Sequence, residues 1–100
     1  MPDYLFLMHG DAPPGCGGRD ENWGRYIGRL RASGHFAGGS EVGGGICVRK
    51  AGTVPSVSAQ LTGFIRVSAA RLDEARSLLA GNPVFEAGGT VEIRELPRTS

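Results

Sequence analysis

The stretch YLFLMH at residues 4–9 decides the fold, because it is an almost continuous apolar run ended by a loop rich in Gly and Pro. A run of this length predicts a β-strand that is buried on both faces. Alternate side chains of a strand point to opposite faces. One face therefore carries Tyr4, Phe6 and Met8, and the other carries Leu5, Leu7 and His9. The rest of the chain must supply cover for both.

Two later segments have the spacing of amphipathic helices. Trp23, Ile27 and Leu30 predict a helix over about residues 20–33, which Gly34 ends. Ser68 can cap a second helix, and the segment 81–83 (Gly-Asn-Pro) ends it. The apolar stripe expected on this second helix is Leu72, Ala75, Leu78 and Leu79.

The remaining segments predict short strands and turns. Residues 35–42 and 46–50 are two strand candidates joined by three glycines at 43–45, a linker that is typical of a β-hairpin. Residues 51–60 indicate a loop, residues 61–67 a strand, and the alternation at 91–94 a last strand.

This order predicts an α+β, ferredoxin-like βαββαβ domain over residues 1–100, with an antiparallel sheet and two helices on one face. Two helices cover only one face of the sheet, and the other face still carries apolar side chains. The same face of a second copy, related by a two-fold axis, is the simplest cover. We therefore expect a homodimer.

Composition and charge exclude several classes of function. The chain has 100 residues, 40% of them hydrophobic, and a net charge of +1, which disfavours disorder and nucleic-acid binding. No apolar run is long enough to cross a membrane, and the N-terminal residues do not resemble a signal peptide, so we expect a cytoplasmic protein. Cys16 and Cys47 lack metal-type spacing and are expected to be free thiols.

Glycine is unusually abundant, with 17 residues. Most glycines fall in expected loops and turns, where special backbone angles are useful. The clusters at 15–18 and 38–45 do not match a phosphate-binding loop, because no Gly-Lys-Ser/Thr sequence follows them. Gly24, Gly28 and Gly63 lie within expected helices or strands and are not explained by turns.

His9 and Asp11 are the best candidates for catalysis. A histidine whose ring nitrogen is held by a carboxylate has the orientation and basicity that proton transfer requires. The alternative is structural: His9 ends a buried strand and bonds a backbone carbonyl, while Asp11 begins the turn before Pro13. The sequence indicates no cofactor and no metal site.

Six further residues are candidates for ligand binding. Trp23, Tyr26 and Phe64, together with Phe36, could form an aromatic wall for a small planar ligand, although core packing also explains them. His35 could bind a ligand or stabilise the end of the first helix, and Glu41 could line a cleft or face solvent. Arg66 could bind an anionic ligand, but an ion pair with Glu92 or Glu95 is favoured.

Five motifs suggest a family. They are YLFLMHGD at 4–11, LTGF at 61–64, LDEA at 72–75, GNP at 81–83 and EAGGTVEIREL at 86–96. Together they span most of the chain and resemble the YciI-related (YCII) family in its DGPF-type branch. The resemblance implies a dimeric α+β barrel, in which two ferredoxin-like subunits pack sheet to sheet. That fold class includes lactone isomerases, monooxygenases and dehydrochlorinases, while most YCII proteins have no assigned activity.

The chain departs from the family at its Asp-Gly-Pro-Phe signature, where residues 54–60 read VPSVSAQ without an acidic residue. Two hypotheses remain open. The first is a dimer that binds a metabolite or a partner protein in a cleft between the sheet and the first helix. The second is a small enzyme without a cofactor, of the isomerase or lyase type, that uses a His/Asp acid–base pair. The absence of the signature acid favours the first.

Overall fold

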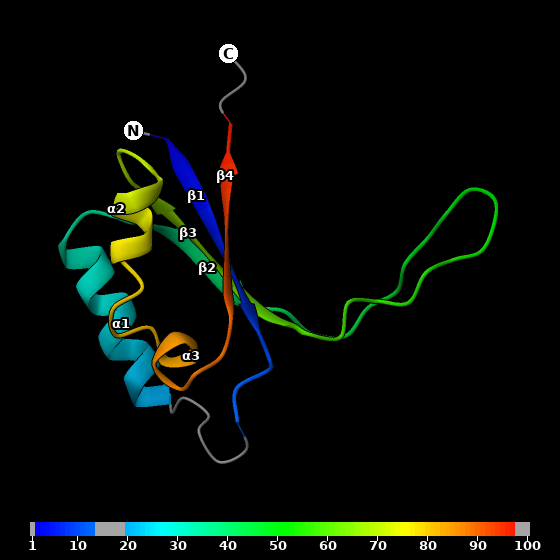
Figure 1. Cartoon of the computed structure of the whole chain (residues 1–100), viewed down its shortest axis with the longest axis horizontal. Helices are drawn as coiled ribbons and strands as arrows, with labels where there is room; N and C mark the ends of the chain where they lie inside the picture. The colour runs from blue at the N-terminus through cyan, green and yellow to red at the C-terminus, as the bar shows by residue number, and fades with distance from the viewer. Residues whose placement is uncertain (1, 14–19, 98–100) are drawn as a thin grey trace.

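The computed structural model describes residues 2–13 and 20–97. Cys16, which was expected to be a free thiol, and the glycine cluster at 15–18 lie outside these residues. The elements in chain order are β1 (Asp3–His9), α1 (Asp20–Ala32), β2 (Phe36–Glu41), β3 (Leu61–Ser68), α2 (Leu72–Ser77), α3 (Pro83–Glu86) and β4 (Val91–Leu96). The strands form one antiparallel sheet in the order β2-β3-β1-β4 (Figure 1). This is the predicted ferredoxin-like α+β fold.

Strand β1 lies inside the sheet, paired with β3 on one edge and with β4 on the other. Its alternation is the predicted one: Tyr4, Phe6 and Met8 are buried, whereas Leu5, Leu7 and His9 are only half-buried. The buried face packs against Tyr26 and Leu30 of α1 and against Ala75 of α2. The helices therefore cover the face of the sheet that carries Tyr4, Phe6 and Met8.

The second helical region differs from the expectation. Ser68 belongs to β3, where its backbone N–H donates to the carbonyl of His35 at 2.8 Å, so it does not cap a helix. The helix α2 is short and begins after Arg71. Leu72, predicted in the apolar stripe, is 54% exposed. Pairing within the sheet thus overrides the local capping signal at Ser68.

A third helix forms where the sequence predicted only a stop. The buried side chain of Asn82 accepts hydrogen bonds from the backbone N–H groups of Val84 (3.0 Å) and Phe85 (3.1 Å). Pro83 then occupies the first helical position, which needs no N–H donor. Asn82 and Pro83 are therefore the start of α3, and the described residues form three helices on the covered face instead of the two expected.

The predicted strand at 46–50 and its hairpin through Gly43–Gly45 are wrong. Residues 42–60 contain no helix or strand, and they form a long connection between β2 and β3 that leaves the body of the molecule (Figure 1). We call residues 42–60 the arm. The strand β2 pairs with β3 instead of with residues 46–50, because Gly39, Ser40 and Glu41 have their partners on β3.

The second face of the sheet has no helix on it among the described residues; we call it the open face. Leu5 and Leu7 of β1 and Phe64 of β3 lie on it, half-buried. Arg66 also lies there and forms an ion pair, as favoured, but with Asp3: its Nε donates to Oδ2 at 2.7 Å. The pairing with Glu92 or Glu95 is therefore wrong.

Glycine-to-alanine substitutions test the packing of β2. A Cβ at Gly39 would lie 2.6 Å from the carbonyl oxygen of Phe64 and 3.2 Å from the Cα of Ile65, both backbone atoms that cannot move aside cheaply. We expect Gly39→Ala to lower the free energy of unfolding by about 1–3 kcal/mol in equilibrium denaturation followed by circular dichroism.

Gly28→Ala is the matched control. Among the described residues nothing lies within 4 Å of a Cβ at Gly28, which is in the interior of α1. Alanine should raise the free energy of unfolding there by up to about 1 kcal/mol. A Gly39→Ala protein as stable as the wild type would contradict the close packing of β2 on β3.

Candidate functional site

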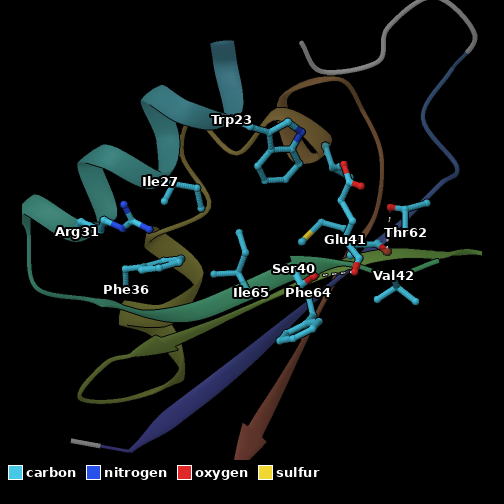
Figure 2. A pocket seen from close by; sticks show the side chains of 14 residues that line it. Trp23, Ile27, Arg31, Phe36, Ser40, Glu41, Val42, Thr62, Phe64 and Ile65 are labelled. Carbon is cyan, nitrogen blue, oxygen red and sulfur yellow. Dashed lines mark hydrogen bonds between the residues drawn. The ribbon is translucent and has the colours of Figure 1, made fainter. Parts of the chain in front are cut away.

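A cavity of about 540 Å³ lies between helix α1 and the ends of strands β2 and β3. This volume is in the range of sites for small organic ligands. Trp23, Ile27 and Arg31 of α1 lie on one side of it, and Phe36, Glu41 and Ile65 lie on the sheet side (Figure 2). The predicted cleft between the sheet and the first helix is present at this position.

Two glycines of the sheet line the cavity. Gly63 pairs with Met8 on one neighbouring strand and with Glu41 on the other, so all three positions face α1. Gly39 pairs with Ile65 on the same face. A Cβ at Gly63 would lie 3.2 Å from the carbonyl oxygen of Ser40 and 3.4 Å from Cε of Met8, so a side chain would be crowded there as it would be at Gly39. This explains Gly63, for which the sequence offered no reason.

The two ends of the cavity differ in charge. The guanidinium carbon of Arg31 lies 5.1 Å from the centre of the Phe36 ring, a cation–π contact that places a positive group at one end. At the other end the Glu41 side chain rises on the same side of the sheet as Trp23 (Figure 2). Between the two ends lie the apolar groups of Trp23, Ile27 and Ile65.

Of the six predicted ligand-binding residues, three line this cavity: Trp23, Glu41 and Phe64. Only Trp23 and Glu41 present their side chains on the helix side. Phe64 pairs with Ser40 and Leu7, and its ring lies on the opposite side of the strands from Trp23 (Figure 2).

The other three predicted ligand-binding residues do not line the cavity. Tyr26 is in the core, 2% exposed, where its hydroxyl donates to the carbonyl of Leu78 at 2.8 Å and burial raises its pKa. His35 lies beyond the end of α1, and its Nδ1 donates to the carbonyl of Ser68 at 2.7 Å. Arg66 is on the open face with Asp3.

His9 lies on the open face and its carboxylate partner is Glu92, with Nε2 and Oε1 3.2 Å apart. Because an ionised carboxylate only accepts, Nε2 is the donor, which leaves Nδ1 as an acceptor whenever the ring is neutral. The other oxygen of Glu92 accepts from Nη1 of Arg94 at 3.1 Å. His9 thus has the kind of partner that was expected, supplied by β4 instead of by Asp11.

Asp11 is bonded to Thr90. Its two oxygens accept from the backbone N–H of Thr90 at 2.7 Å and from its hydroxyl at 2.6 Å. These bonds, the hydroxyl bond first, lower the pKa of the exposed Asp11 carboxyl below its ordinary value. Asp11 therefore ties the segment after β1 to the start of β4.

Several lining residues were not foreseen. Among them are Met8, Ile27, Arg31, Thr62 and Val84. Ser40, which was expected beside Glu41, does line the cavity. Ile27 and Arg31 follow Trp23 at helical intervals of four, so the position of Trp23 in the helix could have indicated them. Val84 could not be found in this way, because it reaches the cavity from α3, a helix that the sequence did not predict.

Comparisons with known proteins show the fold. No family model matches the chain, and no curated protein matches it. Among solved structures, 5-chloro-2-hydroxyhydroquinone dehydrochlorinase from Burkholderia phenoliruptrix AC1100, in complex with 2,5-dihydroxybenzoquinone, is similar with a TM-score of 0.56 and 17% identity. The match covers 97% of this chain and 95% of that chain. At this level of identity the likeness shows a shared α+β, ferredoxin-like fold and no more.

The described residues contain neither a membrane-spanning helix nor a cluster of metal ligands. None of their helices is long and apolar enough to cross a membrane. In the same part of the chain, no three His, Cys, Asp or Glu side chains gather as they would around a metal ion.

The bond between Asp11 and Thr90 predicts an effect of pH. In Thr90→Val the hydroxyl donor is lost, so the pKa of Asp11 should rise toward its ordinary value of 3.8. A lowered pKa in the folded state stabilises the protein above the unfolded pKa, and this contribution disappears as the pH falls through the folded value. The stability difference between wild type and Thr90→Val should therefore shrink below about pH 4.

The measurement is an NMR titration of the Asp11 carboxyl carbon, together with denaturation at several pH values. Thr62→Val is the control, because the Thr62 hydroxyl donates to the carbonyl of Met8 and does not contact Asp11. Equal Asp11 titration in wild type and Thr90→Val would show that the hydroxyl bond does not set this pKa.

Proposed function

We propose that the protein binds a small planar organic molecule in the cavity between α1 and strands β2 and β3. The observation that carries this proposal is an apolar cavity of about 540 Å³ with Arg31 at one end and Glu41 at the other. Such sites hold a ligand by apolar contact and orient it by a few polar groups.

The lining indicates the chemical class of the ligand. Trp23, Ile27 and Ile65 offer apolar contacts to a ring. Glu41 accepts hydrogen bonds, so it suits a hydroxyl or N–H group, and Arg31 suits a carbonyl or an anionic oxygen. A hydroxylated aromatic ring with an oxygen function on the opposite side satisfies both ends. The dehydrochlorinase of the same fold, solved with 2,5-dihydroxybenzoquinone, is consistent with a ligand of this kind.

The finer assignments are also proposals. The motifs quoted above support a YCII-type protein of the DGPF branch. The open face, with Leu5, Leu7 and Phe64 half-buried and no described helix over it, supports a homodimer that packs sheet to sheet. Location in the cytoplasm stays a prediction of the sequence.

The chain has one tryptophan, so the indole N–H of Trp23 is a unique NMR reporter of the cavity. We expect hydroquinone to shift this signal in a saturable way, and 1,4-dimethoxybenzene, which has no donor for Glu41, to bind at least about 10-fold more weakly. Glu41→Gln should weaken hydroquinone binding by about 10-fold or more, because bonds to a charged acceptor contribute about 1.5–3 kcal/mol.

Glu21→Gln is the matched control, since Glu21 is exposed on α1 and is not part of the cavity lining. The proposal fails if neither compound shifts the indole signal. If Glu41→Gln and Glu21→Gln bind hydroquinone equally well, Glu41 is not the hydrogen-bond acceptor for the ligand, and that part of the proposal fails.

A second candidate function is acid–base catalysis by His9 with Glu92. The bond between Nε2 of His9 and Glu92 favours it, because the neutral ring keeps Nδ1 as a proton acceptor. This pair is on the open face and His9 is not among the cavity residues, so the reaction would take place between the sheets of a dimer. The dehydrochlorinase of the same fold is an enzyme, and this supports the second candidate.

Chloride release from 5-chloro-2-hydroxyhydroquinone tests the second candidate. If it holds, the wild type releases chloride faster than buffer does, and His9→Asn lowers the rate by about 10²–10⁴-fold, the usual contribution of a general acid or base. His35→Asn is the control, because the His35 ring bonds a backbone carbonyl away from Glu92. A wild-type rate equal to that of buffer would remove this substrate from consideration.

A further inference from the structure

The arm, residues 42–60, is an extended segment without a core of its own. Every residue in it is exposed except Cys47. Figure 1 shows it as a green loop that runs from the ends of β2 and β3 away from the helices and the sheet. It carries five of the large apolar side chains that are exposed in the described part of the chain: Val42, Ile46, Val48, Val54 and Val57.

These side chains are costly to leave in water. Ile46 and Val48 are 84% and 80% exposed, and they lie two residues apart, as side chains on one face of a strand do. Scattered single apolar residues on a surface need no explanation, but a whole segment of them is typical of an interaction site. The arm therefore has the composition of a segment that packs against another surface.

The dimensions of the molecule support this interpretation. The radius of gyration is 14.9 Å, whereas a compact domain of this length has about 13 Å. The protein exposes 6882 Å², whereas a compact monomer of 10.5 kDa exposes about 5400 Å². The difference exceeds the area of about 800 Å² that each partner buries in a standard protein interface.

A second copy of this chain is the partner that fits. Each copy has an arm to cover, an open face with Leu5, Leu7 and Phe64, and a sheet edge at β4 that pairs only with β1. A two-fold arrangement meets all three needs at once, because each arm reaches the partner while the partner's arm reaches back. Exposed strand edges are common sites for added strands.

Length and charge agree with such an arrangement. Each limb of the arm has about nine residues and reaches about 30 Å, while a four-stranded sheet is about 15–20 Å across. The charged residues of the arm are Arg49 and Lys50, so the arm has a charge of +2. Since the net charge of the whole chain is +1, the rest of the chain has a net charge of −1. The edge strand β4 contributes Glu92 and Glu95 against Arg94.

We propose that the arm packs across a second copy of the chain, with Ile46 and Val48 as its main apolar contacts, so that two protomers clasp each other. This inference rests on the proposed homodimer and adds to it the element that holds the two copies together. It does not depend on a ligand in the cavity.

The test compares association of three proteins by sedimentation equilibrium over a wide concentration range. They are the wild type, the arm variant Ile46→Asp with Val48→Asp, and the control variant Leu72→Asp with Phe85→Asp. The control makes the same change at two exposed apolar residues on helices α2 and α3. We expect the dissociation constant of the dimer to rise by about 100-fold or more in the arm variant only.

Hydrogen exchange of the arm amides gives the second readout. In the wild-type dimer the amides of residues 43–58 should exchange more slowly than in the dissociated protein, and in the arm variant this protection should be lost. Circular dichroism checks that all three proteins keep their fold.

The possible outcomes distinguish a failure of the proposed arm contact from a failure of the proposed homodimer. A wild-type dimer with unprotected arm amides, or an arm variant that associates as tightly as the wild type, overturns the clasp and leaves the dimer standing. Protection of the arm in a monomer overturns the clasp as well, because the arm then packs on its own body. A protein that is monomeric at every concentration overturns both.

Discussion

The pairing of β1 on both of its edges is the constraint on which the rest of the structure depends. A strand inside a sheet cannot rotate to hide all of its apolar side chains on one side, so Tyr4, Phe6 and Met8 face the helices while Leu5 and Leu7 face the other way. The helices cover only the side chains of Tyr4, Phe6 and Met8. The open face, the position of His9 beside Glu92 and the separation of that pair from the cavity all follow from this division.

The sequence was sufficient for the features that are carried by neighbouring residues. The alternation at 4–9 and the spacing of Trp23, Ile27 and Leu30 gave the central strand and α1, since each pattern is set by the geometry of a single element. Features that depend on distant residues were missed. Arg66 pairs with Asp3 across two strands, and nothing near either residue in the chain indicates the other. Likewise, Ser68 has a capping side chain, but its backbone is already engaged by the sheet.

The cavity shows why a candidate site is harder to predict than a fold. A binding side chain such as Trp23 is visible in the sequence, yet the cavity beside it is also lined by Gly39 and Gly63, where close contacts leave little room for a side chain. Those glycines acquire meaning only once the register places Gly63 between Met8 and Glu41. The prediction of an aromatic wall is only partly correct for the same reason. Tyr26 and Phe64 have suitable rings, but helix phase places Tyr26 in the core and strand alternation places the Phe64 ring on the other side of the sheet.

The register of the central strand also joins segments that are far apart in the sequence. Asp3 pairs with Ser68 of β3 and with Leu96 of β4, so one edge of β1 finds its partner only when the distant segment that forms β4 is present. Contacts between residues so far apart in sequence close large loops and slow the folding of small domains. Until β4 arrives, the apolar strand β1 has one unpaired edge. A chain in which β4 has not yet paired therefore exposes one edge of its most apolar segment, which is the kind of surface that favours aggregation.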